Sequence, residues 1–488
     1  MNAPEKRVTE LERRSELAQF FTPPAIAQFM ASLFTSGSNT NCLLLDAGAG
    51  KGALSQAFLD RWLSADLSFT SVRLDAFEID ETLCSSLSRT LARYGGVPGF
   101  SACIHNTDFI QATVEEQRSP LFSRATTQYT HAILNPPYKK IRSDSLYRAA
   151  LRRVGIETVN LYTAFVALSL LLLADHGQLV AIVPRSFCNG PYYRPFRDFV
   201  LEHAALRHMH LFKSRASAFE ADDVLQENLI IFLERGGQQS DVTVSSSTDH
   251  SFFDLTTHRF AFDQIVLPDD KERFIHVPTS SQQNALDLLP KSLYSLEQLG
   301  VEVSTGPVVD FRLKEHLRGM PERHSVPLLY PSHFTHSSMN WPRPEGKRPN
   351  AILDNAETRK WLYPNGYYCV VRRLSSKEER RRVVASVVEP LIFPDASLIG
   401  IDNHLNVLHN HRRGLPEMLA RGLAVYLNTT AVDEYFRRFN GHTQVNATDL
   451  RLIKYPSRDV LVKLGEWAKR QPEITQRMID NAYGAVIA

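Results

Sequence analysis

Short apolar runs alternate with amphipathic segments through the first half of the chain. Five runs have the length of buried strands, the third of them only weakly: 42–46, 72–78, 101–109, 130–134 and 177–184. The longest apolar stretch, 161–174, is too short to cross a bilayer and predicts a buried helix. This order of strands and helices predicts an α/β domain with a doubly wound, mostly parallel sheet.

The pattern changes near the middle of the chain. A cluster of glycine and polar residues at 236–241 predicts a loop, and short strand-like runs resume at 301–306 and 326–330. A chain of 488 residues is also long enough for two domains. We therefore expect a first domain at 1–270 and a second at 271–488.

Charge differs between the two halves, although the whole chain carries only +2. Residues from Lys271 onward include 30 Lys and Arg against 23 Asp and Glu, and the residues before it include 25 against 30. This imbalance indicates that the second half faces a polyanion, although an ordinary mixed surface is also compatible with it. The five cysteines form no C-x-x-C pair and the N-terminus is polar. These features predict a soluble, cytoplasmic protein without a disulfide framework, a zinc site or a membrane partner.

The tetrapeptide Asn135-Pro136-Pro137-Tyr138 directly follows the fourth apolar run. Two successive prolines cannot continue a sheet ladder or begin a helix, so the chain leaves the strand in a stiff bend. The Asn135 side-chain oxygen and the Pro136 carbonyl can accept both hydrogens of a planar amino group, and the Tyr138 ring can stack on the ring that carries it. A plain strand-to-loop turn with an exposed tyrosine explains the same four residues.

Glycines at 48, 50 and 52 follow the first apolar run and allow a ligand to approach the backbone closely. Their spacing matches neither a phosphate-binding P-loop nor the strict dinucleotide fingerprint. This turn therefore favours a nucleoside ligand that carries no phosphate.

Acidic residues follow the next two strand signals. Glu78 can accept the two hydroxyls of a ribose, and Asp108 can accept a hydrogen from an adenine amino group. Ile79 and Phe109 can pack on the adenine ring. Taken alone, each acidic residue is an ordinary helix cap or surface charge, but their order at successive strand ends favours a ligand.

Two basic segments are candidate phosphate contacts, with solvated surface as the alternative for both. The candidates in the first segment are Lys139 and Lys140, and those in the second are Arg372, Arg373, Arg380 and Arg381. The first segment adjoins the proposed amino-group acceptor, and the second belongs to the basic half of the chain.

Together these residues resemble the amino-directed DNA methyltransferases that use S-adenosylmethionine, in particular their TaqI-like subgroup. The matching cofactor segments are Thr22-Pro23-Pro24, Asp46-Ala47-Gly48-Ala49-Gly50-Lys51-Gly52, Glu78-Ile79-Asp80 and Asp108-Phe109. The tetrapeptide resembles the catalytic motif of the family, and its Pro137 is assigned to the cofactor side. The cofactor motifs come first, the tetrapeptide second and a long recognition region last, as in the family. The glycine-rich turn at 46–52 contains more glycine here than in the TaqI methyltransferase that typifies the subgroup.

The resemblance implies a Rossmann-like methyltransferase domain followed by an α+β target-recognition domain. It implies transfer of a methyl group to a flipped adenine in double-stranded DNA, with Asn135, Pro136 and Tyr138 catalytic. Tyr138 and Phe219 would stack on the base, with Phe212 as the alternative to Phe219. His442 and Gln444 are further candidates for DNA contact.

The family context implies a type II restriction–modification system, with a cognate restriction endonuclease as functional partner, or a solitary methyltransferase. Two other functions remain open from the sequence. RNA-directed and glutamine-directed protein methyltransferases resemble the same arrangement, although the long basic second half disfavours a protein substrate. A DNA-binding protein that keeps the fold without catalysis is disfavoured by the intact tetrapeptide.

Overall fold

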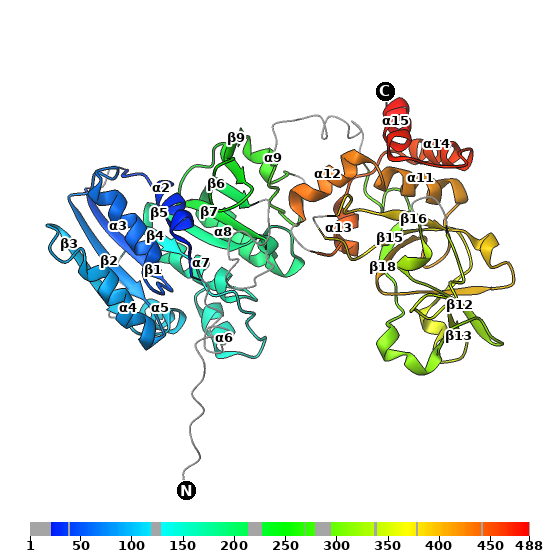
Figure 1. Cartoon of the computed structure of the whole chain (residues 1–488), viewed down its shortest axis with the longest axis horizontal. Helices are drawn as coiled ribbons and strands as arrows, with labels where there is room; N and C mark the ends of the chain where they lie inside the picture. Colours follow the sequence, from blue (N-terminus) through cyan, green and yellow to red (C-terminus); the bar gives the residue numbers. More distant parts are fainter. Residues whose placement is uncertain are drawn as a thin grey trace, which may run out of the picture. The chain divides into compact units, whose positions relative to one another are not determined.

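The structure, a computed structural model, divides into two compact units, Met1–Ser281 and Gln282–Ala488 (Figure 1). The described residues are 21–37, 40–118, 128–212, 227–268, 270–278, 294–335, 339–376, 379–440 and 443–487. Phe219 and His442 lie outside these ranges. None of the helices within them is long and apolar enough to span a membrane.

The first unit is built on a nine-stranded sheet in the order β3-β2-β1-β4-β5-β7-β6-β8-β9. Its strands are β1 (Asn41–Ala47), β2 (Ser71–Phe77), β3 (Phe100–His105), β4 (Tyr129–Leu134), β5 (Leu173–Pro184), β6 (Ala204–Phe212), β7 (Asn228–Arg235), β8 (Val242–Ser247) and β9 (Thr256–Phe260). Strands β1 to β5 pair in parallel, and β7 runs antiparallel between β5 and β6. The predicted doubly wound, mostly parallel sheet is confirmed.

Helices cover both faces of this sheet. One face packs against α2 (Pro24–Ser32), α3 (Ala53–Leu63) and α4 (Glu81–Ala92), and the other against α5 (Phe109–Arg118), α6 (Leu146–Arg153), α7 (Leu161–Leu172) and α8 (Arg194–His203). Successive strand residues alternate between the two cores: Leu44 and Ile133 belong to the first, and Leu45 and Leu134 to the second. Strand β5 begins directly after α7, earlier than the apolar run at 177–184 predicts.

The second unit combines two small sheets with a group of helices, an α+β arrangement. The sheets have the strand orders β10-β18-β15-β16 and β11-β13-β12-β17-β14. Their strands are β10 (Glu302–Thr305), β11 (Leu317–Arg318), β12 (Ser325–Leu329), β13 (Ala351–Leu353), β14 (Leu362–Pro364), β15 (Tyr368–Arg372), β16 (Ala385–Val388), β17 (Leu398–Ile401) and β18 (Leu405–His409). The helices are α11 (Glu417–Leu427), α12 (Thr430–Phe439), α13 (Ala447–Leu452), α14 (Arg458–Lys469) and α15 (Gln476–Ile487).

Helices α11 and α14 cross at two glycines. A Cβ atom on Gly422 would lie 1.8 Å from the carbonyl oxygen of Leu461, and one on Gly465 would lie 1.9 Å from that of Met418. Only hydrogen fits at either position. The two backbones therefore approach more closely than any other residue type would allow.

Candidate functional site

A cavity of about 340 Å³ opens among the turns that follow β1, β2, β3 and β4. These turns lie at the carboxyl ends of parallel strands, where ligands of open α/β sheets bind. The predicted site residues that line it are Gly48, Gly50, Glu78, Ile79, Asp108, Phe109, Asn135, Pro137, Lys139 and Lys140. The tertiary structure thus gathers four separate sequence motifs around one space.

The glycine turn after β1 has the backbone conformation that its composition predicts. Gly48, Gly50 and Gly52 have φ angles of 80°, 56° and 86°, which glycine adopts without a Cβ clash. A Cβ atom on Gly48 would lie 3.6 Å from the Phe165 ring and 4.0 Å from the carbonyl oxygen of Asn135. The turn and the tetrapeptide are therefore immediate neighbours.

Glu78 ties this turn to the end of β2. Its side chain accepts hydrogen bonds from the backbone N–H groups of Gly50 and Asp80, each at 2.8 Å. The residue is only 4% exposed, and burial raises its pKa while these two hydrogen bonds oppose the rise. The carboxylate is thus fixed at the cavity wall.

Asp46 and Ala47 are the last two residues of β1; they are buried and are not among the lining residues of the cavity. Asp46 is fully buried, and its Oδ2 accepts a hydrogen bond from the Ser55 hydroxyl at 2.5 Å. Burial raises the pKa of Asp46 to about 7. Its Oδ1 has no hydrogen-bond partner among the described residues.

Asp108 directly precedes α5, and its side chain contacts two polar groups. One carboxylate oxygen accepts from the N–H of Gln111 at 3.0 Å, as a helix cap does, and the other accepts from the Tyr147 hydroxyl. Burial, and to a smaller extent this hydrogen bond with Asp108, raises the pKa of Tyr147 to about 12. Asp108 thus combines the capping role with a position on the cavity wall.

Aromatic side chains form much of the remaining wall, and sequence reasoning missed most of them. Phe21, Phe77, Tyr147 and Phe165 line the cavity beside the predicted Phe109. The Phe109 ring centroid lies 5.2 Å from that of Phe77 and 5.1 Å from that of Phe165. No motif marks these positions, because only the fold brings α5, α7 and the end of β2 together. The available signals were that Phe21 precedes the Thr22 motif and that Phe77 precedes Glu78.

The tetrapeptide holds the Asn135 amide between two hydroxyl groups. Asn135 Nδ2 donates to the Thr22 hydroxyl oxygen at 2.9 Å, and Asn135 Oδ1 lies 3.2 Å from the Tyr138 hydroxyl. That hydroxyl also lies 3.1 Å from the carbonyl oxygen of Ile182. Burial raises the pKa of Tyr138, whose ring meets that of Tyr162 edge-on. Tyr138 is therefore turned toward the core and is not among the lining residues of the cavity.

The arginine-rich segment 372–382 makes several contacts within the second unit. Arg372 forms an ion pair with Glu379. Arg373 donates to the side-chain oxygen of Gln444 at 3.4 Å, so two predicted DNA-contact residues are partners of each other.

Arg381 donates to Gln476 and to the carbonyl oxygen of Thr429, at 2.6 and 2.9 Å. Burial lowers its pKa. Arg380 is exposed, and together with Arg372 and Arg381 it lines a second cavity, of about 760 Å³. The segment therefore joins elements of this unit and also presents basic groups at this second cavity.

The other predicted contact residues belong to the first unit. Lys139 and Lys140 are exposed, whereas Phe212 is a buried core residue.

Comparison with known proteins gives strong and extensive matches. The family model described as "Eco57I restriction-modification methylase" matches residues 72–219. The type II methyltransferase M.BsuBI of Bacillus subtilis is 51% identical over 461 residues, which are 94% of this chain and 91% of that protein. The type II methyltransferase M.PstI of Providencia stuartii is 44% identical over 92% of this chain and 88% of that protein.

Solved structures share the fold at low sequence identity. The type IIL restriction–modification enzyme MmeI in complex with DNA has a TM-score of 0.53 and 10% identity, over 98% of this chain and 74% of that chain. The DrdV–DNA complex also has a TM-score of 0.53, with 14% identity, over 93% of this chain and 57% of that chain. At this identity the likeness concerns the fold alone.

Proposed function

The chain belongs to the type II DNA methyltransferases of restriction–modification systems, and from this premise we propose that it methylates adenine. The methyl group of S-adenosylmethionine would be transferred to the exocyclic amino nitrogen of a flipped adenine in double-stranded DNA. One observation carries this proposal: the glycine turn and Asn135 of the tetrapeptide line the same cavity.

The cavity residues fit a nucleoside-bearing sulfonium cofactor. Gly48 and Gly50 leave room for close backbone approach, and the fixed Glu78 carboxylate can accept ribose hydroxyls. Phe109 and Ile79 offer apolar surface for an adenine ring, and Asp108 supplies an acceptor beside it. S-adenosylmethionine would contribute an electrophilic methyl group on a positively charged sulfur.

Asn135 and Pro136 would prepare the amino nitrogen for attack. The lone pair of an amino group on an aromatic ring is delocalised, which makes the nitrogen a poor nucleophile. When Asn135 Oδ1 and the Pro136 carbonyl oxygen accept its two hydrogens, the nitrogen is held in the pyramidal geometry that attacks the methyl carbon. The amino nitrogen would exchange one hydrogen, released to solvent as a proton, for the methyl group that the bound cofactor supplies. Positioning and fixed dipoles supply most of the rate gain.

Tyr138 would move when the base enters. Its hydroxyl now lies 3.2 Å from Asn135 Oδ1, the atom assigned to accept an amino hydrogen. Rotation of the ring away from Ile182 would release that oxygen and present the aromatic face for stacking on the adenine. The aromatic partner proposed for the opposite face of the base, Phe219, lies outside the described residues.

Duplex DNA is the proposed substrate, and residues 271–488 are the proposed target-recognition domain. Flipping the adenine out of the stack costs a few kcal/mol. Contacts of Lys139, Lys140 and Arg380 with phosphates would offset part of this cost, because all three side chains are exposed. A cognate restriction endonuclease is the proposed functional partner, without a requirement for direct contact.

Sequencing of modified bases in DNA from cells that express the protein tests the proposal. We expect N6-methyladenine at one short recognition sequence and no other modified base. A parallel assay offers tritiated cofactor with duplex DNA, RNA and protein substrates. Incorporation only into RNA or protein would replace this function with the alternative substrate class, and methylcytosine in DNA would contradict the adenine assignment.

A further inference from the structure

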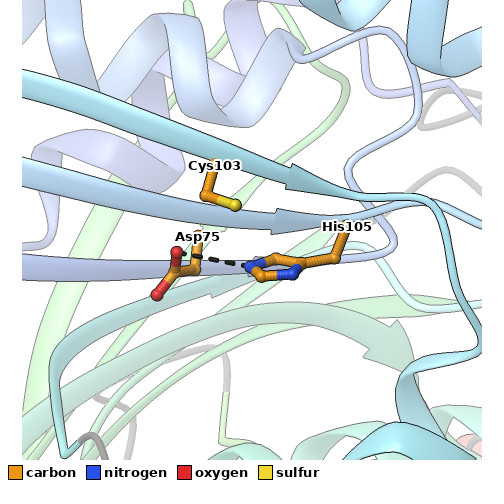
Figure 2. Close-up of side chains that lie close together, drawn as sticks. All are labelled: Asp75, Cys103 and His105. Carbon is orange, nitrogen blue, oxygen red and sulfur yellow. Dashed lines mark hydrogen bonds and ion pairs between the residues drawn. The ribbon is translucent and has the colours of Figure 1, made fainter.

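Three side chains with metal-binding atoms meet on β2 and β3 (Figure 2). Asp75 comes from β2, and Cys103 and His105 come from β3; their ligand atoms all lie within 4.8 Å of one another. We propose that these residues bind one Zn²⁺ ion, with water in the fourth position.

Strand register brings the three side chains together. Asp75 is the direct neighbour of Cys103 in the parallel ladder, and His105 follows two residues later on the same strand. Side chains two residues apart on a strand share a face of the sheet. The cluster is therefore a consequence of backbone pairing between two adjacent strands.

The distances suit a small tetrahedral ion. His105 Nε2 lies 3.3 Å from Asp75 Oδ1. Two nitrogen or oxygen ligands of tetrahedral zinc, with bonds of about 2.0 to 2.1 Å, are separated by roughly 3.3 Å. With a Zn–S bond of about 2.3 Å, the Cys103 sulfur needs to approach the other two ligand atoms by at most roughly 1.3 Å, and rotation of this short side chain can supply that.

Neighbouring groups already orient two of the ligands. The Tyr129 hydroxyl donates to Asp75 Oδ2 at 3.1 Å, which leaves Oδ1 directed at the imidazole. The His105 ring stacks on Phe77, with centroids 4.5 Å apart and planes at 17°. Such outer contacts fix ligand orientation in metal sites. The same Phe77 lines the cavity of the proposed methyl-transfer site, so the zinc site would adjoin that cavity without sharing a ligand with it.

The donor set and its exposure decide which ion can enter. A thiolate with an imidazole favours zinc over magnesium or calcium, which prefer oxygen ligands. Cys103 is exposed and β3 is the edge strand of the sheet, so the ion has a path from solvent. Arg73 carries a positive charge that opposes the binding of a cation, because its guanidinium lies 3.6 Å from Asp75 Oδ2. Its side chain is 56% exposed and can turn into water when a cation binds.

Cobalt titration of the full-length protein, freed of metals by a chelator, tests the site. We expect one equivalent of Co²⁺ to bind with a near-ultraviolet thiolate-to-cobalt absorption band, and one equivalent of Zn²⁺ to displace it. Cys103→Ser should remove the band, and Asp75→Asn should weaken Co²⁺ binding about 10-fold or more. Cys84→Ser is the matched control, because Cys84 is a free cysteine outside the cluster, and this variant should keep the band.

Thermal unfolding provides a second measurement that does not depend on cobalt. Zinc should raise the Tm of the wild-type protein and leave that of Cys103→Ser unchanged, whereas the two proteins should melt alike in chelator. A protein that shows no thiolate band with Co²⁺, or a band that survives Cys103→Ser, would overturn the proposal. The Asp75–His105 contact would then be only a hydrogen bond between β2 and the edge strand β3.

Discussion

The Thr22 hydroxyl oxygen lies 2.9 Å from Nδ2 of Asn135, across 113 residues of sequence. In this contact the hydroxyl oxygen accepts a hydrogen bond from the amide NH₂ of Asn135. The amide oxygen is thereby turned to the side where Tyr138 now lies. The sequence motif suggested a cofactor contact for Thr22, and the structure adds this contact with the proposed catalytic residue.

Replacing Thr22 should therefore slow methyl transfer more than it weakens cofactor binding. Thr22→Val keeps the shape of the side chain and removes the acceptor, so the amide loses its fixed orientation. We expect kcat to fall about tenfold, equivalent to about 1.4 kcal/mol, which is in the range of one hydrogen bond. Thr22→Ser should retain most of the rate. Calorimetry gives the dissociation constant for S-adenosylmethionine, which should change little if Thr22 acts by orienting Asn135. If Thr22 instead binds the cofactor directly, Thr22→Val would weaken cofactor binding with little change in kcat.

Asn135→Ala removes the proposed acceptor itself. We expect kcat to fall about 100- to 1000-fold or more, because a lost preorganised polar group at the reacting atoms costs that much. Cofactor and DNA affinities should change little, since other residues supply those contacts. Single-turnover methylation with separate binding titrations measures each quantity, and turnover close to that of the wild-type protein would end the proposed mechanism.

Glu78→Gln tests the cavity as the cofactor site. Both carboxylate oxygens accept backbone N–H groups, so the amide NH₂ of glutamine would face one of these donors. We expect cofactor affinity to fall about tenfold or more, as the turn loses one hydrogen bond to a charged group. An unchanged dissociation constant in a normally folded variant would place the cofactor elsewhere.

Gly422→Ala should destabilise the second unit. The added methyl group would overlap the Leu461 carbonyl oxygen and force α11 away from α14. We expect a loss of about 1–3 kcal/mol in the free energy of unfolding, as for other overpacked positions. Gly484→Ala is the matched control, since nothing lies within 4 Å of the position of its Cβ. Urea denaturation compares the two variants, and equal midpoints would contradict the tight crossing.

His210 should make the protein less stable in mild acid. The ring is buried, with Nδ1 2.8 Å from the Ser245 hydroxyl oxygen and Nε2 3.1 Å from that of Ser247. Burial lowers the pKa of His210 from 6.5 to about 3. The unfolded chain takes up a proton below pH 6.5 and the folded chain does not, so stability falls as the pH drops from 6.5 toward 3. At pH 5 the loss from this residue is about 2 kcal/mol.

The variant His210→Gln removes this contribution, while its buried neighbour His208 remains in both proteins. The difference in unfolding free energy between pH 7.5 and pH 5.0 should shrink by about 2 kcal/mol relative to the wild-type protein. The raised pKa of Asp46 acts in the opposite direction over part of this range, because a protonated buried carboxyl favours the folded state as the pH falls. That effect is common to both proteins and cancels in the comparison. An equal pH dependence in the two proteins would show that His210 titrates normally.

The chain pattern was sufficient for the first five strands of the sheet and for the order of their ligand-facing turns. Apolar runs of strand length, each followed by glycine, an acidic residue or Asn135-Pro136, are local signals, and a parallel sheet places all such strand ends at one edge. This is why Gly48, Glu78, Asp108 and Asn135 could be named together without coordinates. The start of β5 was misjudged because 173–176 adjoin an apolar helix, and periodicity alone does not separate the two elements.

Only the tertiary structure decided which side chains contact one another across that edge. The Thr22–Asn135 hydrogen bond joins residues far apart in sequence, and Tyr138 turns toward Ile182. Most of the aromatic wall comes from residues outside the predicted motifs, such as Tyr147 and Phe165. The Asp75, Cys103 and His105 cluster likewise depends on pairing between two strands. Composition and spacing report local preference, whereas contacts between distant segments depend on register and packing, which are set only when the whole core forms.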